Sequence, residues 1–192
     1  MSPQLILASA SPRRSELLKQ IGIRHSIKSV DIDETPMPGE LPLAYVERIS
    51  AEKSAACLAI LGDEDLPVLS ADTSVVCDGL IMGKPENMQQ AIAMLSTLSG
   101  RTHQVYSAVS LRGDRHWQAV NVSEVTFRPL SQAEIIAYWQ TGEPCDKAGA
   151  YAIQGMGGVF VENIAGSFSG VMGLPLFETA QLLAQQGIKV IA

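Results

Sequence analysis

Short apolar runs alternate with helical patterns along the chain, and this alternation is typical of an α/β protein. The most strand-like run extends from Pro67 to Val76, and Cys77-Asp78-Gly79 after it predicts a hairpin turn. The other predicted strands cover residues 5–8, 25–30, 80–82, 102–112, 116–128 and 159–164.

Helices are predicted where apolar residues recur at three- and four-residue spacing between recognisable ends. Ser11 and Pro12 resemble an N-cap and a first helical position, and Gly22 ends that helix. Ser131 to Glu134 fits a capping box. The predicted helices cover residues 12–21, 43–61, 88–99, 132–141 and 175–186, and the predicted loops cover residues 31–42 and the glycine-rich segment 149–158.

The last of the long predicted strands changes the parity of its apolar positions. Val120 and Val122 share one face, whereas Val125 and Phe127 fall on the other, and this slip predicts a bulge near Ser123-Glu124. Neither an internal repeat nor a linker interrupts the pattern, so we expect residues 1–192 to form one domain.

Composition and charge exclude several classes of protein. Hydrophobic residues make up 46% of the 192 residues, which is incompatible with intrinsic disorder. The formal net charge of −6 makes sequence-independent binding to nucleic acid a poor expectation, because such binding needs a broad basic surface. Any anionic ligand must therefore be held by a local cluster of cations.

The cysteines and the apolar runs bear on location. Cys57, Cys77 and Cys145 are scattered and odd in number, so a disulfide framework or zinc site is not expected, and a reducing cytoplasm is the simplest location. The first residues lack the pattern of a signal peptide, and no apolar run approaches the length of a membrane span, so we expect no membrane partner.

The segment between the first strand and the first helix is a candidate phosphate site. Arg13 and Arg14 fall in the first helical turn, where cations face the positive end of the helix dipole. A bound anion reverses that preference, since free backbone N–H groups, the hydroxyls of Ser9 and Ser11, and two guanidinium groups would converge on one phosphate. The alternative is that both arginines point into solvent.

Three further charges are candidates for the same site. Lys53 occupies the buried stripe of its helix, where it either meets an anionic partner or extends its ammonium to water. Asp72 interrupts the most apolar strand, near the position where open α/β sheets place their ligands, although it could instead end the strand. Glu34 and Lys84 support a site, but each alone is compatible with ordinary surface.

The combined inventory favours a polyphosphate and a metal ion. Carboxylates suit Mg²⁺, which commonly shares its coordination shell with substrate phosphates. Neither a P-loop nor a nucleophile elbow is present, and the spacing of the three histidines fits no metal site, so none of them is expected to be catalytic.

Ordered motifs along essentially the whole chain resemble the Maf family of nucleoside triphosphate pyrophosphatases. The matching stretches are residues 7–14, 33–34, 52–53, 71–73, 83–85, 98–100, 146–151, 153–155 and 171–175. The resemblance implies an elongated mixed sheet with flanking helices, two lobes around a central cleft (the Maf and ITPase-like arrangement), and a homodimer. It also implies hydrolysis between the α- and β-phosphates with Mg²⁺ or Mn²⁺.

Carried over by motif, the resemblance implies a role for each candidate. Asp72 would be the general base and, with Glu34, would hold the metal. The triphosphate would be neutralised by Arg13, Arg14, Lys53 and Lys84. Thr73 after Asp72 is similar to the subgroup acting on dTTP and UTP, in which Arg13, Thr73 and Gln154 are tied to base selection. The alternative function is a non-catalytic nucleotide-binding regulator of cell division, which would need the cations but not the water-activating carboxylate.

Overall fold

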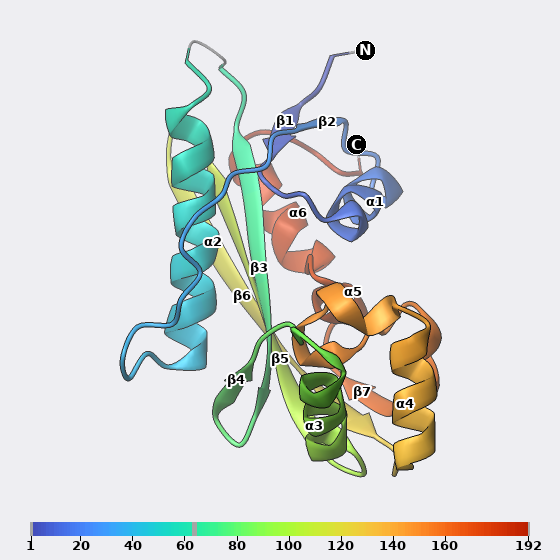
Figure 1. Cartoon of the computed structure of the whole chain (residues 1–192). Helices are drawn as coiled ribbons and strands as arrows, with labels where there is room; N and C mark the ends of the chain where they lie inside the picture. The colour runs from blue at the N-terminus through green and yellow to red at the C-terminus, as the bar shows by residue number, and fades with distance from the viewer. Residues whose placement is uncertain (1, 63–64, 192) are drawn as a thin grey trace.

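The computed structural model describes residues 2–62 and 65–191, and it confirms the predicted mixed α/β architecture with helices flanking a seven-stranded sheet (Figure 1). The strands are β1 (Leu5–Leu7), β2 (His25–Ile27), β3 (Val68–Cys77), β4 (Leu80–Met82), β5 (Thr102–Arg112), β6 (His116–Phe127) and β7 (Val161–Ala165). The α-helices are α1 (Pro12–Gln20), α2 (Pro42–Ala59), α3 (Met88–Leu98), α4 (Gln132–Gln140), α5 (Phe168–Met172) and α6 (Leu176–Gln185). Three 3₁₀ helices, η1 (Glu143–Asp146), η2 (Ala148–Ala150) and η3 (Met156–Phe160), complete the fold.

The sheet has the strand order β2-β1-β3-β5-β6-β7, with β4 paired to β3. β1 is parallel to both β2 and β3, and the other pairs are antiparallel. The long strands β3, β5 and β6 extend through both lobes of the elongated molecule (Figure 1). They therefore join the lobes into one continuous sheet.

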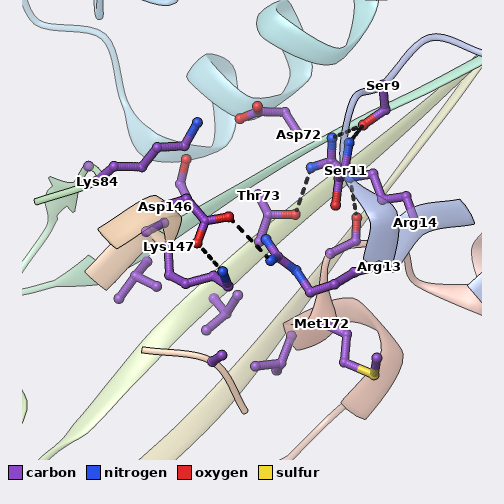
Figure 2. A pocket seen from close by; sticks show the side chains of 18 of the residues that line it. Ser9, Ser11, Arg13, Arg14, Asp72, Thr73, Lys84, Asp146, Lys147 and Met172 are labelled. Atoms are coloured by element: carbon purple, nitrogen blue, oxygen red, sulfur yellow. Dashed lines mark hydrogen bonds and ion pairs between the residues drawn. The ribbon is translucent and has the colours of Figure 1, made fainter. Parts of the chain in front are cut away.

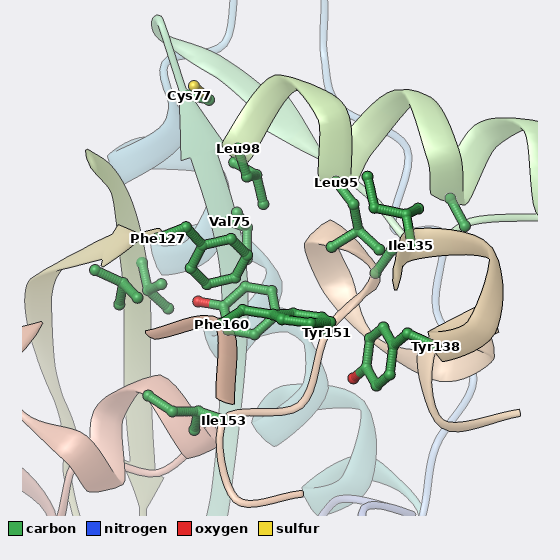
Figure 3. Packing of buried hydrophobic residues seen from close by; sticks show 14 residues of the cluster. Val75, Cys77, Leu95, Leu98, Phe127, Ile135, Tyr138, Tyr151, Ile153 and Phe160 are labelled. Atoms are coloured by element: carbon green, nitrogen blue, oxygen red, sulfur yellow. The ribbon is translucent and has the colours of Figure 1, made fainter. Parts of the chain in front are cut away.

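The two faces of the sheet are covered differently along its length. α2 packs on one face, where Val46 and Ile49 meet Ala108 and Val120. On the opposite face, α1 and α6 cover one lobe, and α3 and α4 cover the other (Figure 1). Figure 3 shows the aromatic part of the core beside α3 and α4, where the rings of Phe127 and Phe160 meet edge to face.

The predicted bulge near Ser123-Glu124 is wrong. β5 and β6 pair in unbroken register from Thr102↔Thr126 to Arg112↔His116, and the irregularity lies between Thr126 and Phe127 against β7. The apolar positions change parity because the covered face changes: Val120 faces α2, whereas Phe127 faces the core beside α3 and α4. No extra residue is needed to explain the pattern.

Other differences lie in short elements. The strand expected over residues 25–30 ends at Ile27, because its partner β1 ends opposite it at Leu7. α5 was not predicted, since five residues are too few to establish a helical period. The glycine-rich segment expected as a loop contains part of η2 and part of η3.

One edge of β3 is interrupted at its centre. β1 pairs with Val68 and Leu69, β4 pairs with residues 75–77, and no described strand pairs with the edge between them. Asp72 and Thr73 lie in this gap, and their side chains alternate to opposite faces of the strand. A ligand in the gap can therefore reach groups on both faces of the sheet.

Candidate functional site

A cleft of about 470 Å³ opens at the gap in the β3 edge, between the two lobes. One lobe contributes the start of α1, and the other contributes the segments around residues 81–84 and 146–154. Every site residue that was predicted from the sequence lines this cleft: Ser9, Ser11, Arg13, Arg14, Glu34, Lys53, Asp72, Thr73, Lys84 and Gln154. Residues from distant parts of the chain are thus brought to one cavity.

Lys53 forms the central ionic contact of the cleft. Its Nζ lies 2.9 Å from Oδ1 of Asp72 and 2.8 Å from Oε1 of Glu34, and its side chain is only 12% exposed. The α2 face that packs on β3 directs Lys53 towards Asp72, so the lysine has anionic partners rather than an exit to water. Burial opposes ionisation of Glu34, but the hydrogen bond and charge of Lys53 hold the pKa of Glu34 below its usual value.

Arg14 binds the groups on the other face of β3. Its Nε donates to the carbonyl oxygen of Gly173 at 2.9 Å, its Nη1 to Oγ of Ser9 at 3.2 Å, and its Nη2 to Oγ1 of Thr73 at 3.5 Å (Figure 2). Burial lowers the pKa of Arg14, and the charge of Asp72 opposes this shift. The guanidinium therefore ties the start of α1 to β3 and to the end of α5.

Ser11 occupies the N-cap position of α1 as expected, but its side chain makes no capping hydrogen bond. Ser9 Oγ instead accepts a hydrogen bond from the backbone N–H of Ser11 at 3.2 Å. The first turn of α1 therefore presents backbone N–H groups to the cleft together with Arg13, which is the arrangement that binds anions.

Asp146 and Lys147 line the cleft as well, although the local sequence pattern predicts no role for them. Oδ2 of Asp146 lies 3.8 Å from Nη1 of Arg13, and its Oδ1 contacts the ammonium of Lys147 (Figure 2). Their only signal in the sequence was their place at the start of the family-like stretch 146–151. Asp146 is thus the counter-ion of two cations of the cleft.

Lys84 approaches the cleft from the side opposite the arginines, with Asp72 and Thr73 between them (Figure 2). The backbone beside it is anchored because the carbonyl oxygen of Gly83 accepts from the N–H of Gly149 at 3.1 Å. Five cationic and three acidic side chains line the cleft, although the whole chain has a net charge of −6. This local excess of positive charge suits an anionic ligand.

The carboxylates of the cleft are the candidate ligands of a metal ion. In the part of the chain that the structure describes, no group of three or more His, Cys, Asp or Glu side chains is arranged to hold one. Glu34 and Asp72 nevertheless converge on a single cation, the Lys53 ammonium. Two converging carboxylates fit Mg²⁺ or Mn²⁺ when substrate phosphates and water complete the shell.

The three histidines lie outside the cleft and bind other groups. His25 contacts Oγ of Ser15 at 2.8 Å, and His116 contacts Oγ of Ser110 at 2.8 Å. His103 is buried, with Nε2 2.9 Å from the hydroxyl of Tyr151. Their positions fit structural roles.

Fold and cleft together define an α/β protein with a site for a phosphate-type anion. The family model described as "Maf-like protein" matches residues 4–186, so the chain belongs to the Maf-like family.

Curated relatives are similar over nearly the full chain. A dTTP/UTP pyrophosphatase of Methylococcus capsulatus is 56% identical over 96% of this chain and 92% of its own. A nucleoside triphosphate pyrophosphatase of Haemophilus ducreyi is 49% identical over 100% of this chain and 99% of its own. Among solved structures, the Ham1 protein of Staphylococcus aureus matches with a TM-score of 0.46 at 17% identity, covering 64% of this chain and 71% of that one.

Proposed function

We propose that this protein hydrolyses nucleoside triphosphates, with dTTP and UTP as preferred substrates, to the nucleoside monophosphate and pyrophosphate. The observation that supports it best is the contact of Lys53 with both Asp72 and Glu34 inside a cleft lined by four other cations. A protein that only binds nucleotides would need the cations but not a carboxylate held in the centre. The relatives named as dTTP/UTP pyrophosphatases support the substrate class.

In the proposed reaction, Asp72 accepts a proton from the water that attacks the α-phosphorus. A bond forms between the water oxygen and phosphorus, and the bond to the oxygen bridging the α- and β-phosphates breaks. Arg13, Arg14 and Lys84 stabilise the charge that develops on the departing pyrophosphate. Preorganised cations are effective here because they need no reorientation during the reaction.

Glu34 and Asp72 are the proposed ligands of a divalent cation, Mg²⁺ or Mn²⁺. When bound, such an ion neutralises phosphate charge and lowers the pKa of a coordinated water. A carboxylate alone is a weak base towards water, so the ion and Asp72 would activate the water together. Removal of divalent ions with EDTA should therefore abolish turnover, and Mg²⁺ or Mn²⁺ should restore it.

Three further points belong to the same proposal. Residues 1–192 form a single catalytic domain, which the continuity of β3, β5 and β6 through both lobes supports. The protein acts in the cytoplasm, as its three scattered cysteines favour. It acts as a homodimer, which analytical ultracentrifugation tests; large exposed apolar side chains such as Phe177 and Leu80 are compatible with an interface. No described helix has both the length and the apolar character to cross a bilayer.

The test is a product assay with dTTP, UTP, CTP and GTP, in which pyrophosphate and orthophosphate are scored separately. The wild type should release pyrophosphate from dTTP and UTP, and Asp72→Asn should lose about 10²–10⁴-fold in kcat while still binding nucleotide. Orthophosphate as the first product would overturn the proposed bond cleavage. Binding without any turnover in the wild type would instead favour a regulator.

A further inference from the structure

The segment that contains Gln154 is held from outside the cleft. Ala152, Ile153 and Gln154 line the cleft, and the side chain of Gln154 is exposed to it. Gln154 makes no side-chain hydrogen bond to any other described residue, so its position is set by the backbone on either side of it. The contacts of residues 152 and 156–157 therefore determine where Gln154 lies.

Tyr138 of α4 and Glu143 of η1 provide those contacts. The hydroxyl of Tyr138 accepts from the backbone N–H of Ala152 at 3.0 Å and donates to Oε1 of Glu143 at 2.6 Å. Glu143 in turn accepts from the N–H of Met156 and of Gly157, each at 2.9 Å. The two side chains thus form a clamp that grips the backbone before and after Gln154.

The glycines of this segment make the clamp possible. A Cβ at Gly155 would overlap the carboxylate of Glu143, and a Cβ at Gly157 would lie 2.6 Å from the hydroxyl of Tyr138. Glycine at these two positions leaves the space in which the Glu143 carboxylate and the Tyr138 hydroxyl approach the backbone. This accounts for a glycine-rich segment that lacks the sequence context of a phosphate loop.

The ionisation states fit the hydrogen bonds. Burial opposes ionisation of Glu143, but the bonds from Tyr138, Gly157 and Met156 hold the pKa of Glu143 below its usual value. Burial raises the pKa of Tyr138, so its hydroxyl keeps the proton that it donates. Tyr138 is also fixed by packing, with its ring centroid 4.9 Å from that of Phe160 (Figure 3).

We propose that the Tyr138–Glu143 clamp positions Gln154 and thereby determines how well the cleft discriminates between nucleobases. This inference rests on the proposed nucleotide hydrolysis, which it deepens. Tyr138 and Glu143 are positioning residues, since neither lines the cleft. Release of the clamp should affect recognition of the base and leave the phosphate-binding half of the cleft unchanged.

The experiment compares Tyr138→Phe and Glu143→Gln with matched controls. Tyr106→Phe removes a hydroxyl that binds Gln104 at 3.0 Å outside the cleft, and Glu134→Gln alters the capping box of α4. Each protein is assayed for kcat and KM with dTTP and dCTP, and for competitive inhibition by tripolyphosphate, which has no base. Thermal unfolding identifies a temperature at which all variants are folded.

Both clamp variants should reduce the ratio of kcat/KM for dTTP to that for dCTP by about tenfold, mainly through KM for dTTP. Inhibition by tripolyphosphate should change less than twofold, and the controls should keep the wild-type ratio. Gly155→Ala, which displaces Glu143 without removing it, should reproduce the loss of discrimination.

Two results would overturn the clamp. One is an unchanged dTTP-to-dCTP ratio in all three variants; the other is an equal loss for both nucleotides and for tripolyphosphate, which indicates general damage. A wild type that releases no pyrophosphate from any nucleotide would instead refute the proposed function, so the two failures are distinguishable.

Discussion

Lys53 and Asp72 form an ion pair across the interface of α2 and β3, with 2.9 Å between Nζ and Oδ1. The same ammonium lies 2.8 Å from Oε1 of Glu34, which lies in the loop before α2. A single cation thus fixes the separation of two carboxylates that come from different elements. Because both partners of Lys53 are acidic, its removal should affect catalysis and the pH dependence of stability together.

Lys53→Met should reduce kcat at least 100-fold, because Asp72 loses the partner that orients it. It should also change how the free energy of unfolding depends on pH in the acidic range. The pKa of Glu34 is lower in the folded protein than its usual value of 4.5, so the ion pair stabilises the wild type above about pH 4.5. That contribution is lost as the pH falls through the folded-state pKa, and Lys53→Met should lose less on acidification. Urea unfolding between pH 3 and 7 measures this; Lys19→Met at the exposed end of α1 is the control and should behave as wild type.

Arg14→Lys should be more damaging than Arg13→Lys. Arg14 donates from three nitrogens to Gly173, Ser9 and Thr73, and an ammonium cannot reproduce that planar geometry. Loss of the donor to the Gly173 carbonyl should destabilise the protein by about 1–3 kcal/mol. Arg13 has one weak contact to the exposed Asp146, so Arg13→Lys should leave the urea midpoint nearly unchanged. Equal midpoints for both variants would contradict this assignment.

Gly149→Ala should destabilise the fold by more than about 2 kcal/mol. Gly149 has a φ of +68°, and a Cβ there would lie 2.9 Å from Cγ1 of Val75. Val75→Ala in the same chain removes the two γ-methyl groups but keeps a Cβ 3.0 Å away, so it should relieve part of the overlap and none of the backbone strain. In a double-mutant cycle the cost of Gly149→Ala should therefore be smaller, yet still about 1 kcal/mol, in the Val75→Ala background. Full additivity would show that the overlap with the two γ-methyl groups contributes nothing.

His103 should make stability depend on pH in the mildly acidic range. Burial lowers the pKa of His103 from 6.5 to about 4, so between these values the unfolded chain binds a proton that the folded chain excludes. Stability should therefore fall as the pH drops from 6.5 to 4, by at most about 1.4 kcal/mol per pH unit from this residue. His103→Gln should reduce the slope while retaining a partner for Tyr151. An NMR titration midpoint of His103 near 6.5 would contradict the explanation.

Much of the site could be predicted because several of its charged residues occupy positions that local rules disfavour. Such positions are unfavourable for a charge unless a ligand or partner is present. Two arginines in the first turn of α1, a lysine in the buried stripe of α2 and an aspartate within β3 each break such a rule. Asp146 and Lys147 break none, since they lie in a short 3₁₀ segment and beside it, and their place in the cleft could not be predicted from local rules. The Tyr138–Glu143 clamp could not be predicted for the same reason, because the sequence pattern makes Tyr138 an ordinary apolar position of α4.

The sequence by itself determined the order and type of the longer helices and strands, because helix caps, glycine stops and apolar periods act over a few neighbouring residues. It also determined which residues were candidates for binding phosphate. Only the tertiary structure decided which face of each strand is covered, as the parity change between Val120 and Phe127 illustrates. It alone decided that β1 and β4 leave Asp72 and Thr73 at an open edge. Those features depend on packing between segments far apart in the chain, and local sequence patterns do not specify which distant segments pack together.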